Sequence, residues 1–142
     1  MSSTPNEILD LACKLALSSD GTDVNEVTLR CSTSRAYYAA MHAADESLPA
    51  DLSPSAAERK SKSSHQAVID AVLKWANEIR PGRTEARTVA RNLPRLRDAR
   101  KRADYKISEV FTLRDAESAL RIARSTLQSA ARAAEMSVEK QA

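Results

Sequence analysis

The chain of 142 residues is poor in cysteine, glycine and aromatic residues. It contains two cysteines, two glycines and five aromatic residues. Cys13 and Cys31 lie on two different predicted helices and form no close metal-type spacing, so we expect both to be reduced and buried. The scarcity of glycine and aromatic residues, together with abundant alanine, leucine and arginine, favours helices over strands.

The chain also lacks segments that would place it in or across a membrane. No run approaches the roughly 20 apolar residues of a membrane span. Residues 1–5 have neither the basic nor the apolar region of a secretory signal, so we expect a cytoplasmic protein without membrane contact. The sequence contains no glycine-rich phosphate loop, no paired metal carboxylates and no nucleophile elbow, and it therefore predicts no metal ion and no cofactor.

Charge is present in both signs but is unevenly distributed. The formal net charge is +3. Residues 80–106 contain ten basic and three acidic side chains, which gives this segment +7 and leaves −4 for the rest of the chain. This asymmetry indicates an anionic partner, either RNA or an acidic protein surface.

Apolar residues recur at helical spacing in five segments, which predicts an all-α fold. Thr4 and Glu7 fit a capping box, and Thr112 with Asp115 fits a second one. Five amphipathic helices with mostly short connections predict an antiparallel up-and-down bundle, formed by one domain over residues 1–142 with its core at about 5–135. The expected helices cover residues 5–18, 24–48, 63–79, 84 onward, and 112–135.

Three places interrupt the helical pattern. Residues 50–63 are rich in serine and lysine and predict a flexible loop, with at most a turn of helix at 56–58. Pro94 falls inside the fourth helix and predicts a kink or short break there, because proline removes an amide donor and clashes with the preceding turn. The tail at 136–142 is expected to fray.

The second helix carries the first candidate site. Its apolar stripe is expected to follow a near-heptad step through Val27 and Cys31. Arg35, Tyr38 and His42 are three and four residues apart, so they share one face. An arginine can bind phosphate and a histidine can act as acid or base, which is the pairing that cleavage through a 2′-hydroxyl requires. Alternatively, these side chains only pack and form intramolecular bonds.

His65 is the other histidine of the chain, and it falls in the first turn of the third expected helix. There it can face a ligand at the open backbone amides. Equally, it can cap the helix or face water.

The fourth expected helix carries a basic stripe. Arginines at positions 83, 87, 91 and 95 recur every four residues and line one edge, which can follow a phosphate backbone. The alternative is a solvated face with intrahelical pairs. Few aromatic residues accompany the stripe, so base stacking on it is poorly supported. Further basic residues extend it: Arg97, Arg100, Lys101 and Arg102. Asp104 and Tyr105 place a carboxylate and a phenol beside this group, and Asp104 can pair with Arg100 one turn back.

Three segments resemble, in order, motifs of the small HEPN-domain proteins. They are Ser34–Ala44 (SRAYYAAMHAA), Ser64–Ile69 (SHQAVI) and Leu96–Tyr105 (LRDARKRADY). The resemblance covers about residues 5–135. It implies a bundle of four to five helices, usually dimeric, that is often encoded beside a minimal nucleotidyltransferase and acts as a toxin or defence component. Many members are metal-independent ribonucleases.

The ribonuclease members of that family use an arginine followed a few residues later by a histidine, late in the bundle. Here the late motif ends in Asp104-Tyr105, and no histidine follows His65. Two hypotheses therefore stay open. The first is a homodimer that binds RNA or a nucleotide and can cleave it with Arg35, His42 and Arg100, the ligand being held by Tyr38, His65, Arg97, Arg102, Asp104 and Tyr105. The second is a non-catalytic module that docks a nucleotidyltransferase or another acidic protein.

Overall fold

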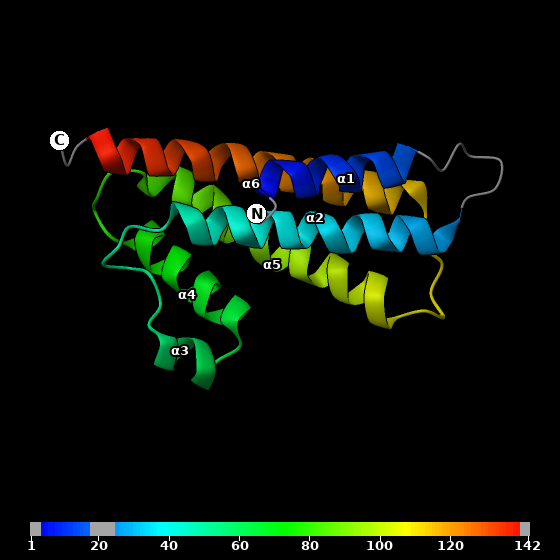
Figure 1. Ribbon diagram of the computed structural model, residues 1–142, viewed down its shortest axis with the longest axis horizontal. Helices are drawn as coiled ribbons and strands as arrows, with labels where there is room; N and C mark the ends of the chain where they lie inside the picture. The colour runs from blue at the N-terminus through cyan, green and yellow to red at the C-terminus, as the bar shows by residue number, and fades with distance from the viewer. Residues whose placement is uncertain (1–3, 18–24, 140–142) are drawn as a thin grey trace.

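The computed structural model describes residues 4–17 and 25–139, and it confirms an all-α bundle (Figure 1). Among the described residues there are six helices and no strand. The helices are α1 (Pro5–Leu17), α2 (Glu26–Ser47), α3 (Ala56–Ser61), α4 (Ser64–Asn77), α5 (Arg83–Tyr105) and α6 (Leu113–Glu139). The sequence predicted about five because α3 lies inside the expected loop. The expected helix ends at residues 18 and 24 lie outside the described residues. The tail at 136–142 was expected to fray, but residues 136–139 continue α6, and residues 140–142 lie outside the described part of the chain.

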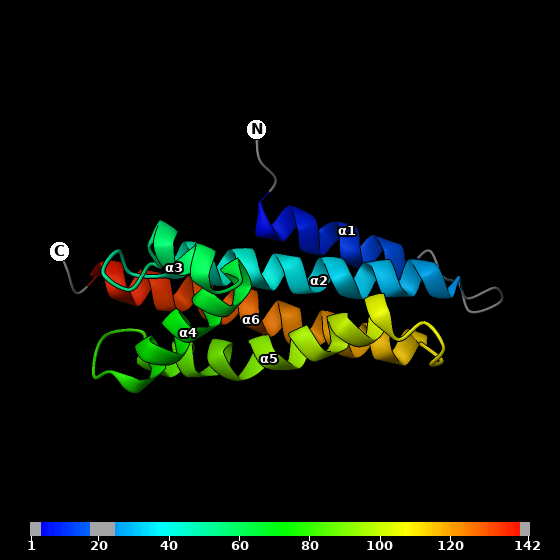
Figure 2. The same cartoon turned by 90° about the horizontal axis from the view of Figure 1, so that it is seen from below.

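Four helices, α1, α2, α5 and α6, run up and down along one axis. In Figure 1, α1 and α5 run from left to right, whereas α2 and α6 run from right to left. Figure 2 shows α2 between α1 on one side and α5 on the other, with α6 behind. The short α3 and the N-terminal half of α4 extend to one side of the bundle. The second helix is thus central, and α1, α4, α5 and α6 all contact it.

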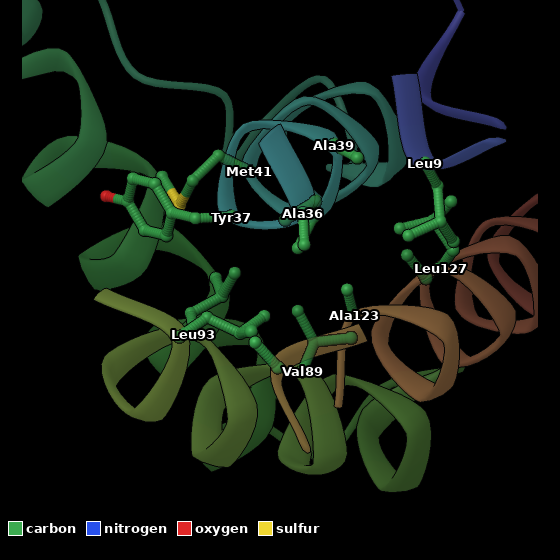
Figure 3. Close-up of a cluster of buried hydrophobic side chains, with 14 of the residues drawn as sticks. Leu9, Ala36, Tyr37, Ala39, Met41, Val89, Leu93, Ala123 and Leu127 are labelled. Atoms are coloured by element: carbon green, nitrogen blue, oxygen red, sulfur yellow. The ribbon is translucent and has the colours of Figure 1, made fainter. Parts of the chain in front are cut away.

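The core fills the space between these helices with mostly small and aliphatic side chains. In Figure 3, Ala36 of α2 points toward Val89 of α5 and Ala123 of α6. Small residues allow the backbones to approach closely, and larger ones fill the remaining space. Residues that carry this packing are Leu9, Ala36, Ala39, Val89, Leu93, Ala123 and Leu127.

The stripe expected for α2 is wrong in its first half. Val27 is 68% exposed and Cys31 is also exposed, whereas Cys13 on α1 is half-buried. The buried side is instead built on residues such as Ala36, Ala40 and Thr33. The near-heptad spacing of the larger residues did not identify the buried side of α2. Several helices surround α2, and the residues that pack closely against them are mostly alanine, serine and threonine.

The helix boundaries follow the expected signals closely. Thr4 Oγ1 accepts from the Glu7 amide at 3.2 Å, and the Thr112 and Asp115 side chains each accept from the other's backbone amide. Gly82 has φ 83° and forms the N-cap of α5, which glycine adopts without strain. The helix that contains Pro94, which is α5, continues through the proline as one element, so the expected break is absent.

Candidate functional site

Three helices bring six side chains together on one side of the bundle, and we call this group the tyrosine–arginine cluster. The middle of α2, the first turn of α4 and the last two turns of α5 meet there. Five of its members were expected at the site from sequence. The sixth, Tyr37, was not placed at the site by the sequence analysis. The members are Tyr37, Tyr38, His65, Arg100, Asp104 and Tyr105.

Arg100 lies at the centre of the cluster. Its guanidinium carbon is 5.8, 5.7 and 5.3 Å from the ring centroids of Tyr37, Tyr38 and Tyr105. Its Nη2 donates to the Tyr38 hydroxyl at 3.2 Å, and its Nε lies 2.8 Å from Asp104 Oδ2. The side chain is 20% exposed. The guanidinium is thus surrounded by π faces that favour a cation, and one carboxylate offsets its charge.

His65 fixes the buried end of the cluster. Its Nδ1 is 2.9 Å from the hydroxyl of Tyr37, which is 1% exposed. Burial, the charge of Arg100 and that of His42 lower the pKa of His65 below its ordinary value of 6.5. Burial raises the pKa of Tyr37, although Arg100 partly opposes this. At pH 7 the imidazole is therefore mostly neutral and the phenol protonated.

The outer edge of the cluster is polar and open. Tyr105 is 67% exposed. Arg35 and His42 are exposed on the neighbouring face of α2, and neither forms a hydrogen bond or ion pair with another described residue. Lys101 is also exposed. The structure thus places Arg35 and His42 beside the cluster without direct contact to Arg100, and they are available to a ligand.

Arg97 joins the cluster to α4 through a chain of polar contacts. Its Nη1 donates to Gln66 Oε1 at 2.8 Å, Gln66 donates to Asp70 at 2.9 Å, and Asp70 pairs with Lys62 at 2.8 Å. The Nε of Arg97 is buried and has no hydrogen-bond partner among the described residues. This leaves a second cation next to Arg100 with one unused donor.

Arg102 was expected at the site, but its side chain lies on another side of α5. It pairs with Asp115 at 3.1 Å and with Glu109 at 3.2 Å, and its guanidinium lies 5.5 Å from the Phe111 ring. Residues that are two positions apart on a helix differ by about 200° in direction, so Arg102 points nearly opposite to Arg100. Its charge is used to join α5 to α6.

A buried arginine that the sequence analysis did not single out holds the end of α5 in place. Arg30 is 8% exposed, and its Nη1 donates to the carbonyls of Arg102 at 3.0 Å and Ala103 at 2.9 Å. It also donates to the carbonyls of Lys106 and Glu109. The carbonyls of Arg102 and Lys106 each also accept a backbone amide, whereas the last carbonyls of a helix generally lack intrahelical partners, and a cation is favourable there. Arg30 therefore positions the turn that carries Asp104 and Tyr105.

The predicted basic stripe of α5 is divided by the fold. The Nε atoms of Arg83 and Arg87 both donate to the Ala76 carbonyl, at 3.2 and 3.3 Å, in the last turn of α4. Arg91 and Arg95 are exposed and form no hydrogen bond or ion pair with other described residues. The first two arginines are anchors, and only the second two remain free for a ligand.

Residues 4–17 and 25–139 contain no group of three histidine, cysteine or acidic side chains arranged to hold a metal ion. In the same part of the chain, no helix combines the length and apolar character of a membrane span. No family model, curated protein or solved structure matches the chain. Functional inference therefore rests on the geometry of the site.

Proposed function

We propose that this chain is a HEPN-like protein that binds RNA or a nucleotide at the tyrosine–arginine cluster. The observation that carries the proposal is Arg100, whose guanidinium lies among three tyrosine rings while one of them, Tyr105, stays 67% exposed. An arginine fixed in this way can contact a phosphate, and an exposed phenol ring can stack on a base. The ligand is bound across α2 and the end of α5.

The charge around the cluster supports an anionic ligand. Arg35, Arg97, Arg100 and Lys101 lie in or beside it, and Asp104 is the carboxylate that pairs with Arg100. Ser34 Oγ donates to Asp104 at 3.3 Å, which holds that carboxylate against α2. Since Arg35 and Lys101 form no ion pair with described residues, a phosphate does not have to displace an internal carboxylate from them.

The two histidines differ in what they can contribute to chemistry on RNA. Nδ1 of His65 is engaged by the Tyr37 hydroxyl, so this imidazole has one ring nitrogen left for a ligand. His42 is exposed, and both of its ring nitrogens are without hydrogen-bond partners among the described residues. If cleavage accompanies binding, His42 is the better candidate for proton transfer.

The test measures binding of a fluorescein-labelled short single-stranded RNA by anisotropy. Tyr105→Ala removes a stacking ring, which is worth about 1–3 kcal/mol, so affinity should fall by about 5-fold to 150-fold. Arg35→Gln should weaken binding as well. Ile107→Ala is the matched control, because Ile107 is similarly exposed on the following turn. Equal affinity of the wild type, Tyr105→Ala and Arg35→Gln would refute the proposal, and a gel of the same RNA with His42→Ala reports any cleavage.

A further inference from the structure

The exposed sides of α5 and α6 carry a second group of cations. Five arginines there are exposed, and none forms a hydrogen bond or ion pair with another described residue. Three of them belong to α6, outside the basic segment that the sequence analysis had singled out. We call this surface the α5–α6 basic face, and it comprises Arg91, Arg95, Arg114, Arg121 and Arg132.

On α6, Arg114, Arg121 and Arg132 point within about 20° of one direction at about 100° per residue, and Arg121 also lines a cavity against α1. Helices α5 and α6 pack side by side in antiparallel register, as shown by Asn92 donating to Ser125 at 3.5 Å and by the ion pair between Arg102 and Asp115. Arg91 and Arg95 are about 6 Å apart along α5, from a rise of about 1.5 Å per residue. On the same basis, the three arginines of α6 span about 27 Å.

A cavity between α5 and α6 can hold an anion. This cavity of about 180 Å³ is lined by Arg95, Ser118, Phe111 and the Arg102–Asp115 pair. The Asp115 carboxylate is already bound by Arg102 and by Thr112, which reduces its repulsion of an anion. Arg95 and the Ser118 hydroxyl are the donors that remain for a phosphate oxygen.

Acidic side chains reduce the charge of the face without cancelling it. Asp98, Glu117 and Glu135 are exposed on the same two helices and form no ion pairs with described residues. Five arginines against these three acids leave a net charge of +2. Arg102 adds none, because Asp115 and Glu109 pair with it.

The composition of the face favours a nucleic acid over a protein partner. The exposed large hydrophobic residues of α5 and α6, which are Tyr105, Met136 and Val138, lie at the helix ends, and none lies between Arg91 and Arg95 or between Arg114 and Arg132. Protein interfaces usually contain an apolar or aromatic anchor at their centre. The aromatic residue of the cavity between α5 and α6, Phe111, is buried and cannot stack on unpaired bases. These features match recognition of a duplex through its phosphates.

We propose that the α5–α6 basic face binds the phosphate backbone of a double-stranded nucleic acid. The length of about 27 Å corresponds to about eight base pairs at 3.4 Å each. This surface goes beyond the proposed function, because Arg95 and Arg100 differ by about 140° in direction around α5 at about 100° per residue. Contacts to phosphate give affinity with little sequence preference.

The test compares two double variants that lose the same charge. Arg95→Gln/Arg121→Gln alters the face, whereas Lys14→Gln/Lys60→Gln removes two exposed lysines from α1 and α3. Binding of labelled duplex RNA and duplex DNA is measured between about 50 and 200 mM salt. For two lost phosphate contacts, the slope of log K against log salt should become shallower by about 1.8, and affinity at 0.1 M salt should fall up to about 60-fold.

The lysine control should keep the wild-type slope. Equal losses in both double variants would overturn the proposal, since total charge alone would then govern binding. Absence of duplex binding, or tighter binding of an acidic peptide through the same arginines, would also overturn it. The proposed function is tested separately, because Tyr105→Ala should weaken binding of short single-stranded RNA and leave the duplex slope unchanged.

Discussion

Replacing Arg30 by methionine should strongly destabilise the fold. The substitution removes the donors to the carbonyls of Arg102, Ala103, Lys106 and Glu109 and a ring contact of 5.2 Å to Phe111. Hydrogen bonds from a charged group contribute about 1.5–3 kcal/mol each, and the apolar methionine recovers part of the loss by avoiding burial of a charge. We therefore expect a loss of about 3 kcal/mol. This corresponds to a melting temperature lower by about 10 °C for a chain of this size.

Arg35→Met is the matched control, because Arg35 lies on the same helix but is exposed and without hydrogen bonds to described residues. Its effect should stay within about 0.5 kcal/mol. Urea unfolding followed by circular dichroism at the helix signal gives both values. If Arg30→Met costs no more than Arg35→Met, the end of α5 does not depend on the buried guanidinium, and its assignment as a positioning residue is wrong.

Three further predictions concern single residues. Gly82→Ala should cost about 2–4 kcal/mol, because φ is 83° and an added Cβ would lie 2.8 Å from the Ala133 carbonyl oxygen; a melting temperature equal to that of Thr84→Ala would contradict this. The lowered pKa of His65 means that the unfolded chain binds its proton more tightly, so stability should be fully present above pH 6.5 and decline as pH falls below it. His65→Gln should remove that decline in denaturation measured against pH, and an unchanged pH dependence would exclude His65 as its origin. His42→Ala should raise the pKa of His65 in an NMR titration, because a nearby positive charge is lost; a pKa that stays the same or falls would show that the two imidazoles do not interact.

Much of the fold could be predicted because its signals are local. Capping residues such as Thr4 and Thr112 and the break around Gly82 mark helix ends within one turn of chain. The short α3 was harder to predict, because it has no buried residues and its stability comes from a capping box at Ser55 and an ion pair of Arg59 with Asp45. Such polar contacts leave no apolar periodicity in the sequence.

The candidate site was predictable only where residues share a helix face. The grouping of Arg100 with Asp104 follows from a spacing of four residues, and the structure has this ion pair at 2.8 Å. The orientation of Arg102 depends on Asp115 of α6, and no local pattern contains that contact. Arg30 falls on the buried side of α2, three residues before Thr33 and seven before Tyr37, so a periodicity that counted small and polar residues could have found it.

The most direct test of the cluster as a ligand site is an NMR titration of the two histidines with a nucleoside monophosphate. The chain contains two histidines, so His42→Ala assigns both ring signals. A phosphate bound beside Arg100 offsets the positive field that helps to lower the pKa of His65. We therefore predict that the His65 signals shift on titration and that its pKa rises in the complex. Ring signals and a pKa that stay unchanged at saturating nucleotide would contradict binding at the cluster.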